Sequence, residues 1–396
     1  MPEEKLRSLA VRGKKVLVRV DFNVPLADGG VGDDTRIRAA LPTIRYLLEQ
    51  NARVILMSHL GRPKGQRKPE FSLAPVAARL SEILGTPVPL APDCVGPQAE
   101  QAVARLQDGQ ALLLENLRFH AGETDNAPEF VDRLAGLGEV YVNDAFGTAH
   151  RAHASTDGVP RKLKAKAPGF LMEKEIRFLT PLLGSPARPY AALLGGAKVS
   201  GKIEVIQNLL PRVDTLLIGG AMMFTFWKAQ GHPVGASLVE DDRVAIAKSV
   251  LARAQESGRS LLLPVDSVAT DDPSKGAPGR VVGEDALAPG EAGVDIGPAT
   301  RSRFATELAK AKTIFWNGPM GIFEQPAYSE GTRAMALALA QATDRGATTV
   351  VGGGDSIAAL KSMGLSDRVT HVSTGGGASL EFLEGKTLPG LAALES

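Results

Sequence analysis

The stretch Tyr190-Ala191-Ala192-Leu193-Leu194-Gly195-Gly196-Ala197-Lys198-Val199-Ser200-Gly201-Lys202 holds the strongest local signal in this sequence. It begins with an apolar run short enough to be a buried strand, and it continues into a glycine-rich turn that carries two lysines. Ile203, Ile206 and Leu209 then recur at helical spacing. A strand, a glycine turn and a helix together direct backbone N–H groups and a helix N-terminus at an anion. We interpret the stretch as a phosphate site.

The same stretch nearly matches the P-loop of nucleotide-binding proteins. Gly196–Lys202 has the spacing of a glycine, four residues and Gly-Lys. The next residue should be Ser or Thr, to supply a hydroxyl to magnesium, and here it is Ile203. A tight packing turn with two solvated lysines therefore remains an alternative when this stretch is considered by itself.

Composition points to an ordinary globular protein. The 396 residues predict two to three domains, and the formal net charge of +1 gives no reason to expect nucleic acid as a partner. Cys94 is the only cysteine, which excludes an intramolecular disulfide and fits the reducing cytoplasm. Met1–Leu9 lacks the apolar core of a signal peptide, and no run approaches the roughly 18 to 20 apolar residues of a membrane span. We expect a cytoplasmic protein that does not bind membranes.

Short apolar runs alternate with helix-length segments along the whole chain. Runs of this length without polar alternation suit strands that are buried on both faces of a parallel sheet. Helices of the right length lie between them, for example Thr35–Gln50 and Leu73–Leu84. The pattern predicts doubly wound α/β architecture. The predicted strands are Val16–Val20, Val54–Met57, Ala111–Leu114, Val140–Val142, Tyr190–Leu194, Leu216–Ile218, Leu261–Val265, Ile314–Trp316, Thr348–Val351 and Val369–Val372.

Polar residues and glycines follow these strands directly. In open parallel sheets, ligands bind just outside the carboxyl ends of the strands, which is where these residues would lie. Turn-forming residues end any strand, so one or two such exits would carry little weight. Arginines and histidines just beyond several exits make a lined cleft the better interpretation. The exits are Asp21, Ser58-His59, Glu115-Asn116, Asn143-Asp144, Gly195-Gly196, Gly219-Gly220, Asp266-Ser267, Asn317-Gly318, Gly352-Gly353 and Ser373-Thr374.

The two halves of the chain present different chemistry. The first half offers a set of arginines able to make bidentate bonds to phosphate or carboxylate, which suggests a small acidic substrate. The second half offers glycine turns, with Asp355 as a candidate magnesium ligand. Between the halves, Pro160–Pro189 is rich in proline and contains an amphipathic pattern over 170–183. We place the domain boundary there, giving domains 1–166 and 167–385, the second including the connecting helix.

Two other kinds of site are rejected on spacing. His150 and His153 stand three residues apart, but no further ligand spacing completes a zinc site. The tract Gly352–Ser356 and the tract Ser373–Ser379 each link a strand to a helix, yet neither has the G-x-G-x-x-G pattern of dinucleotide binding. Hydride transfer is therefore disfavoured.

Taken together, several tracts resemble the phosphoglycerate kinase family from the first strand to the C-terminal tail. The resemblance implies two Rossmann-like domains with mostly parallel sheets, joined by a helix and hinge, with the tail at about 386–396 packing on the first domain. It implies a monomer that reversibly transfers the acyl phosphate of 1,3-bisphosphoglycerate to Mg-ADP, in line and on domain closure, giving 3-phosphoglycerate and ATP in glycolysis. The tracts are Arg19–Pro25, Ser58–Pro63, Glu115–His120, Asn143–Ser155, Leu194–Lys202, Phe315–Glu324, Gly352–Ser356 and Val372–Lys386.

The resemblance also implies roles for individual residues. It assigns catalysis to Arg36, Lys198 and Gly376, and binding of Mg²⁺ to Asp355. It assigns binding of the phosphoglycerate to Asp21, Phe22, Asn23, Arg36, His59, Leu60, Gly61, Arg62, Arg118 and Arg151. It assigns binding of the nucleotide, ADP or ATP, to Gly195, Gly196, Lys202, Gly219, Gly293, Asn317, Glu324, Gly353, Gly354, Asp355 and Ser356. Gly201 and Ser356 depart slightly from the family pattern, and Ser356 keeps the hydroxyl of the more frequent Thr.

This chemistry needs no general base, because the acceptor is already an anion in either direction, and the sequence offers no convincing acid–base pair. Positioning and charge stabilisation would carry the reaction. Two alternatives remain at this point. A P-loop-type ATPase would hydrolyse ATP without phosphoglycerate, and a silent nucleotide-binding scaffold would bind ADP without turnover.

Overall fold

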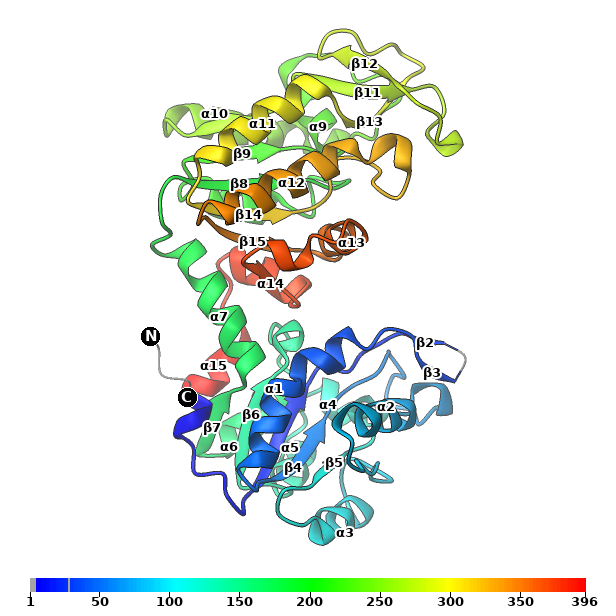
Figure 1. The fold of residues 1–396 in the computed structure, drawn as a ribbon, viewed down its shortest axis with the longest axis vertical. Coiled ribbons are helices and arrows are strands. Elements are labelled where there is room, and N and C mark those ends of the chain that lie inside the picture. Colours follow the sequence, from blue (N-terminus) through cyan, green and yellow to red (C-terminus); the bar gives the residue numbers. More distant parts are fainter. Residues whose placement is uncertain (1–4, 28) are drawn as a thin grey trace. The chain divides into compact units, whose positions relative to one another are not determined.

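The computed structural model describes residues 5–27 and 29–396 (Figure 1). The chain forms two compact units. Unit 1 contains the chain up to Arg177 together with Thr387–Ser396, and unit 2 is Phe178–Lys386. Helix α7, Phe170–Leu183, contains the point where the chain passes from one unit to the other, and its bounds are those predicted from the sequence.

Unit 1 is built on a five-stranded parallel sheet with the order β5-β4-β1-β6-β7. The first strand of this sheet, β1, lies at the centre, with β4 and β5 on one side of it and β6 and β7 on the other. This is the strand order of doubly wound Rossmann-type sheets. The strands are β1 (Lys15–Val20), β4 (Arg53–Met57), β5 (Ala111–Leu113), β6 (Val140–Asp144) and β7 (Ala165–Pro168).

Unit 2 repeats this arrangement in a six-stranded parallel sheet with the order β10-β9-β8-β14-β15-β16. Its central strand β8 is Tyr190–Leu194, the apolar run that begins the glycine-rich stretch. The two doubly wound, mostly parallel sheets predicted from the sequence are thus confirmed. The other strands are β9 (Thr215–Ile218), β10 (Ser260–Leu262), β14 (Thr313–Asn317), β15 (Thr348–Gly352) and β16 (His371–Val372).

The continuous apolar runs reflect burial on both faces of the sheets. In β1, Val16, Val18 and Val20 join one hydrophobic core, and Leu17 joins the core on the opposite face. Helices α1 and α2 contribute to the first of these cores, and α3 and α5 contribute to the second. Because successive side chains of a strand point to opposite faces, a strand covered on both sides has no polar alternation.

Helices surround both sheets, and in unit 2 the helices α11 and α12 lie side by side along the sheet (Figure 1). The helices are α1 (Thr35–Glu49), α2 (Ala74–Leu84), α3 (Pro97–Arg105), α4 (Ala121–Thr124), α5 (Pro128–Ala135), α6 (Val159–Lys162), α8 (Ile203–Leu209), α9 (Met222–Gln230), α10 (Val244–Glu256), α11 (Pro298–Lys310), α12 (Glu330–Asp344), α13 (Gly354–Ser362), α14 (Gly377–Leu383) and α15 (Pro389–Glu395).

Three features were not predicted from the sequence. The edge strand β7 lies within the proline-rich stretch, where Pro168 ends it. A hairpin pairs β2 (Leu26–Ala27) with β3 (Gly30–Val31). A three-stranded antiparallel sheet has the order β12-β11-β13, formed by β11 (Asp266–Thr270), β12 (Arg280–Gly283) and β13 (Ala292–Ile296).

The antiparallel sheet corrects one predicted strand exit. We expected Asp266 and Ser267 to line a cleft after a strand ending at Val265, but β10 ends at Leu262 and Asp266 begins β11. The Asp266 carboxylate accepts backbone N–H groups of Ala299 at 2.9 Å and Thr300 at 2.8 Å, in the first turn of α11. Asp266 therefore satisfies a helix N-terminus, which a carboxylate stabilises.

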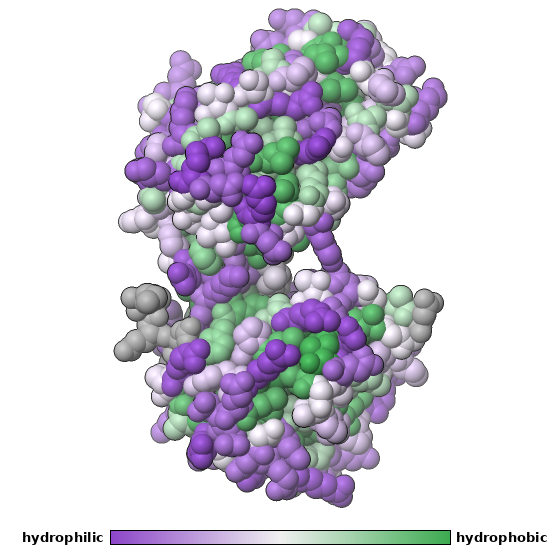
Figure 2. Space-filling view, in the orientation of Figure 1, coloured by the Kyte–Doolittle hydropathy of each residue, from purple (hydrophilic) through white to green (hydrophobic). Residues whose placement is uncertain are grey.

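The C-terminal segment belongs to unit 1. The backbone N–H of Gly390 in α15 donates to the carbonyl of Ala149 at 2.8 Å, and Leu394 packs against the core that α3 and α5 share. Hydrophilic residues make up much of the face shown in Figure 2, with hydrophobic residues exposed between them in each unit. Among the residues described, no helix has the length and apolar character needed to cross a bilayer.

Candidate functional site

In an open parallel sheet a crevice forms at the carboxyl ends of two neighbouring strands whose following connections run to opposite sides of the sheet. In both sheets here this point lies next to the first strand. In unit 1 that point falls between β1 and β6, and in unit 2 between β8 and β14. The segment Asp21–Asn23 follows β1, and Gly195-Gly196 follows β8. The fold therefore places the two most distinctive predicted motifs at the two positions where such sheets bind ligands.

Unit 1 gathers a set of cationic and histidine side chains near the carboxyl ends of its strands. We call this set the basic cluster, and it consists of Arg19, Arg36, His59, Arg62, Arg118, Arg151 and His153. Five of its members were predicted as substrate-binding residues, and Arg19 and His153 were not. Electrostatic effects link its members, since Arg19, Arg118, Arg151 and Arg36 all act on His59.

Hydrogen bonds between strand exits hold the predicted residues in place. Arg36, in the first turn of α1, donates from Nη1 to Asp21 Oδ2 at 2.7 Å. The N–H of Gly61 donates to Asn23 Oδ1 at 2.9 Å, so the segment after β4 is tied to the segment after β1. Phe22 and Leu60 are buried in the core, so only their backbone groups are available to a ligand.

Arg118 carries a buried side-chain donor that lacks a hydrogen-bond partner among the described residues. Its Nη1 donates to the carbonyl of Gly61 at 2.7 Å, while its buried Nε has no hydrogen-bond partner among the described residues. A pocket of about 460 Å³ opens beside it, with Arg62, Arg151 and His153 among its lining residues. A buried donor without a partner costs about 1–3 kcal/mol, which an anion in this pocket would recover.

The electrostatics of the cluster show an excess of positive charge. Burial and the neighbouring Arg151 and Arg19 lower the pKa of Arg118 to about 10. Burial and the charges of Arg118 and Arg19 lower the pKa of His153 to about 4. Burial, followed by Arg19, lowers the pKa of His59 well below its ordinary value. Burial is the largest cause of each shift and the neighbouring cations act in the same direction, so an anionic ligand would be favoured here.

Arg19 is the member that sequence reasoning missed and could have found. It is fully buried in β1, where it is the charged residue of an otherwise apolar strand interior. Its Nε donates to Ser155 Oγ at 2.7 Å, and Ser155 Oγ in turn donates to Glu123 Oε1 at 2.6 Å. Its Nη2 lies 3.2 Å from His59 Nδ1. A charge inside a buried strand is costly unless it is paired, which was the available signal.

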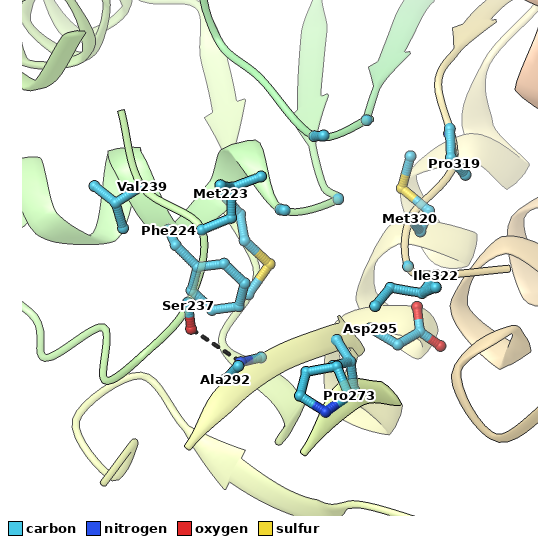
Figure 3. Close-up of a pocket in the computed structure, with 18 of the residues that line it drawn as sticks. Met223, Phe224, Ser237, Val239, Pro273, Ala292, Asp295, Pro319, Met320 and Ile322 are labelled. Atoms are coloured by element: carbon cyan, nitrogen blue, oxygen red, sulfur yellow. Dashed lines mark hydrogen bonds between the residues drawn. The ribbon is translucent and has the colours of Figure 1, made fainter. Parts of the chain in front are cut away.

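Unit 2 contains a pocket of about 620 Å³ that brings four predicted residues together: Gly196, Gly293, Glu324 and Asp355. Its walls are largely apolar. Met223 and Phe224 stand on one side, Met320 and Ile322 stand on the other, and Asp295 and Pro273 lie below them (Figure 3). Sequence reasoning missed these apolar walls, which come from α9, from the loop after β14 and from the antiparallel sheet.

Several predicted glycines are explained by close packing between strand exits. A Cβ on Gly195 would lie 2.2 Å from the carbonyl oxygen of Pro319, and a Cβ on Gly219 would lie 2.5 Å from Met320 Sδ. The backbone of Gly195 also donates to the carbonyl of Asn317 at 2.9 Å. These two glycines do not line the pocket themselves, and they allow the loops that do line it to approach each other.

A second polar group gathers where β14 ends. Lys202 donates from Nζ to Asn317 Oδ1. Burial lowers the pKa of Lys202 to about 8, although the carboxylates of Asp355 and Glu384 act in the opposite direction. Asn317 Nδ2 is buried without a hydrogen-bond partner among the described residues, so it can donate to a ligand oxygen. Ser356 is engaged, because its Oγ accepts the N–H of Gly318 at 2.7 Å.

The remaining predicted residues lie in turns at helix N-termini. Lys198 is exposed in the turn before α8. Gly353 precedes α13 with a φ of 91°, which favours glycine, and Gly354 begins that helix. Gly376 precedes α14 with a φ of 53°. Neither Lys198 nor Gly376 belongs to the pocket lining.

Comparisons with known proteins agree with this geometry. The family model described as phosphoglycerate kinase matches residues 6–386. The phosphoglycerate kinase of Chlorobium luteolum is 56% identical over 395 residues, and that of Chlorobaculum tepidum is 55% identical over 395 residues, each covering 100% of both chains. The structure of phosphoglycerate kinase from Coxiella burnetii has a TM-score of 0.91 at 45% identity, and that from Pyrococcus horikoshii has 0.83 at 35%. Each structure covers 98% of this chain and of its own.

Proposed function

Because the chain belongs to the phosphoglycerate kinase family, we propose that the basic cluster binds the phosphoglycerate and that the pocket of unit 2 binds the nucleotide. The protein is a kinase of glycolysis, which reversibly transfers the acyl phosphate of 1,3-bisphosphoglycerate to ADP and gives 3-phosphoglycerate and ATP. The family establishes the reaction, and the residue roles below are our proposal.

The observation that carries the proposal is Arg118 Nε, which has no hydrogen-bond partner in the described part of the chain and lies beside a pocket whose lining includes Arg62, Lys64 and Arg151. Phosphate and carboxylate groups accept bidentate hydrogen bonds from guanidinium, so Arg62, Arg118 and Arg151 suit the phosphate end of the substrate. Asp21 and Asn23, which follow β1, would hold its hydroxyl group. His59, kept neutral by its surroundings, would act as a hydrogen-bond partner.

In unit 2 the apolar walls formed by Phe224, Met320 and Ile322 suit the flat base of a nucleotide. Glycine-rich turns offer backbone N–H groups to its phosphates, with Lys202 and the free Nδ2 of Asn317 close by. Glu324 lines the same pocket and can accept hydroxyl hydrogens of the ribose.

The acidic groups of this pocket fit a magnesium ion. Asp355 is exposed in the first turn of α13 and lines the pocket, so its carboxylate can bind Mg²⁺ together with nucleotide phosphate oxygens. The ion would neutralise charge on the phosphates. Its recruitment by Asp355 is part of the proposal.

The chain's own residues supply positioning and positive charge. Arg36 has an exposed guanidinium held by Asp21, and Lys198 stands exposed on a glycine turn, so both can follow the phosphoryl group. Since the two ligand sets lie in different units, transfer requires closure that brings the ligands in line and excludes water. We further propose that the enzyme acts as a monomer in the cytoplasm, without nucleic acid or membrane.

A coupled assay with MgATP and 3-phosphoglycerate tests these roles. Arg36→Lys keeps the charge but loses the planar fork, so turnover should fall at least roughly tenfold, nearly as far as in Arg36→Ala. Arg38→Ala is the matched control, because Arg38 lies on the same helix and pairs with Asp34 at 2.9 Å. A large loss of melting temperature with unchanged turnover would make Arg36 a structural residue. Hydrolysis of ATP without 3-phosphoglycerate would instead support a simple ATPase.

A further inference from the structure

Three side chains with metal-ligating chemistry meet in unit 1, and the proposed reaction uses none of them. Asp93 and Cys94 lie in the segment before α3, and His120 lies directly before α4. One potential ligand atom from each residue lies within 4.8 Å of the other two. His120 Nε2 is 2.7 Å from Asp93 Oδ1, and the backbone N–H of Cys94 donates to the same oxygen at 2.7 Å. A carboxylate, a thiol and an imidazole thus converge from two segments far apart in the sequence.

The group is closed on one side and open on the other. Cys94 is fully buried in a hydrophobic core, while the side chains of Asp93 and His120 are 30% and 34% exposed. The His120 ring also packs against Phe130, with ring centroids 5.5 Å apart, which limits its rotation. The carboxylate and the imidazole therefore face solvent, which is the side from which an ion would arrive, and the sulfur is shielded from water.

Two carboxylates, Asp93 and Glu123, act on the Cys94 sulfur. Burial, then Asp93 and Glu123, raise the pKa of the Cys94 thiol well above its ordinary value. His120 and then Arg67 act on Asp93 in the opposite direction. Arg67 Nη2 donates to the carbonyl of Pro92, and its guanidinium lies over the Phe119 ring. A divalent cation would be attracted by these carboxylates, of which Asp93 is itself a proposed ligand.

We propose that Asp93, Cys94 and His120 form a binding site for a zinc-type transition-metal ion, with water in the fourth position. Thiolate and imidazole ligands select Zn²⁺ and Co²⁺ over Mg²⁺ and Ca²⁺, which take oxygen ligands. The site is separate from the proposed magnesium ligand Asp355, which lies in unit 2. It would fasten the segment before α3 to the segment that carries Arg118.

Binding changes the protonation of two ligands. Cys94 releases its proton to solvent as the sulfur–metal bond forms, because the thiolate is the metal ligand. A neutral His120 would bind the ion through Nε2, the nitrogen that faces Asp93. Its single ring proton then has to lie on Nδ1 instead of Nε2. One proton is released for each ion bound, and no oxidation or reduction takes place.

Titration of the full-length, reduced protein with Co²⁺ tests the site. We expect one ion per chain, visible bands of tetrahedral cobalt, and a sulfur-to-cobalt charge-transfer band. Excess Mg²⁺ should leave these bands unchanged. Cys94→Ser should remove the charge-transfer band and weaken binding by at least about tenfold, since loss of even an outer-shell partner costs about 10–100-fold. His120→Asn should weaken binding to a similar extent.

The pair His232 and Asp285 provides a matched control. The distance from His232 Nδ1 to Asp285 Oδ1 is also 2.7 Å, but among the described residues this pair has no third ligating side chain close enough to complete a metal site. His232→Asn should leave the cobalt spectrum unchanged. Zn²⁺ should raise the melting temperature of the wild type and not that of Cys94→Ser. A cobalt spectrum that lacks the charge-transfer band, or one that persists in Cys94→Ser, would overturn the proposal, and neither result depends on kinase activity.

Discussion

Glu240 accepts two hydrogen bonds from Ser200, one from the hydroxyl to Oε1 at 2.5 Å and one from the backbone N–H to Oε2 at 2.9 Å. The backbone N–H of Glu240 in turn donates to Thr225 Oγ1 of α9 at 3.2 Å. Burial alone would raise the pKa of Glu240, but its bonds to Ser200 and the nearby Lys198 hold that pKa below its ordinary value. The exposed turn that carries Lys198 is thereby tied to a buried helix.

Loss of this tie should impair turnover more than folding. In Glu240→Ala the turn loses both bonds, and misplacement of Lys198 should lower turnover roughly tenfold. Ser200→Ala keeps the backbone bond and should lose less activity. The check is steady-state kinetics in the Lys198→Ala background, where removal of Glu240 should cost nothing further. Additive losses would show that Glu240 acts on something other than Lys198.

Lys198 itself should contribute mainly in the transition state. Lys198→Ala should lower turnover by on the order of 10²–10³, the scale for one lost donor to developing charge. Nucleotide affinity, measured by calorimetry, should change much less. Lys248→Ala removes an exposed lysine from α10 and should leave both quantities unchanged. Near-normal turnover in Lys198→Ala would remove that residue from the mechanism.

Gly293→Ala should selectively disturb the pocket of unit 2, which we propose binds the nucleotide. A Cβ at this position would lie 1.9 Å from Phe224 Cζ, so the aromatic wall has to move. We expect KM for ATP to rise roughly tenfold and stability to fall by about 1–3 kcal/mol, the usual cost of overpacking. KM for 3-phosphoglycerate should hold. Gly290→Ala, where a Cβ would meet nothing within 4 Å, should leave both constants unchanged.

Asp144 should make stability depend on pH. Its Oδ1 accepts the N–H of Leu171 at 2.9 Å in the first turn of α7, and burial raises its pKa from 3.8 to about 7. The folded state therefore holds the proton more tightly than the unfolded state. Its contribution is fully present below pH about 4 and is lost as pH rises towards 7, at about 1.4 kcal/mol per unit of pKa difference.

Asp144→Asn removes this proton while keeping an oxygen for Leu171. The melting temperature of the variant, relative to wild type, should rise between pH 5 and pH 8. Asp295 is a second buried carboxyl whose pKa is raised to about 7 by burial, so Asp295→Asn should show the same trend. A constant difference between Asp144→Asn and wild type across this range would mean that Asp144 does not titrate on folding.

The parallel sheets could be predicted because their strands are buried on both faces, which leaves unbroken apolar runs such as Tyr190–Leu194. The antiparallel sheet could not, because β12 is partly exposed and its run Arg280–Gly283 has no such pattern. The position of Asp266 was predicted wrongly for a different reason. A carboxylate after an apolar run looks alike whether it faces a cleft or satisfies the first turn of α11.

The charged half of the candidate site was easier to predict than its apolar half. Arginines beyond strand ends stand out in a sequence, whereas Phe224 and Met320 resemble ordinary core residues, and both are buried. Glycines are ambiguous in another way, since Gly195 serves close packing while Gly196 lines the pocket. Sequence alone cannot separate these roles, because both need a residue without a side chain. The role of each residue in binding stays a prediction.

The division of the chain also sets the order in which the units can be completed. Unit 2 is one continuous stretch, Phe178–Lys386, while unit 1 needs Thr387–Ser396 in addition to its earlier residues. A ribosome therefore finishes every residue of unit 2 before it makes α15, whose Gly390 bonds to Ala149. Domains fold as units during synthesis. Unit 2 can thus reach its native state on the ribosome before helix α15 of unit 1 has been synthesised.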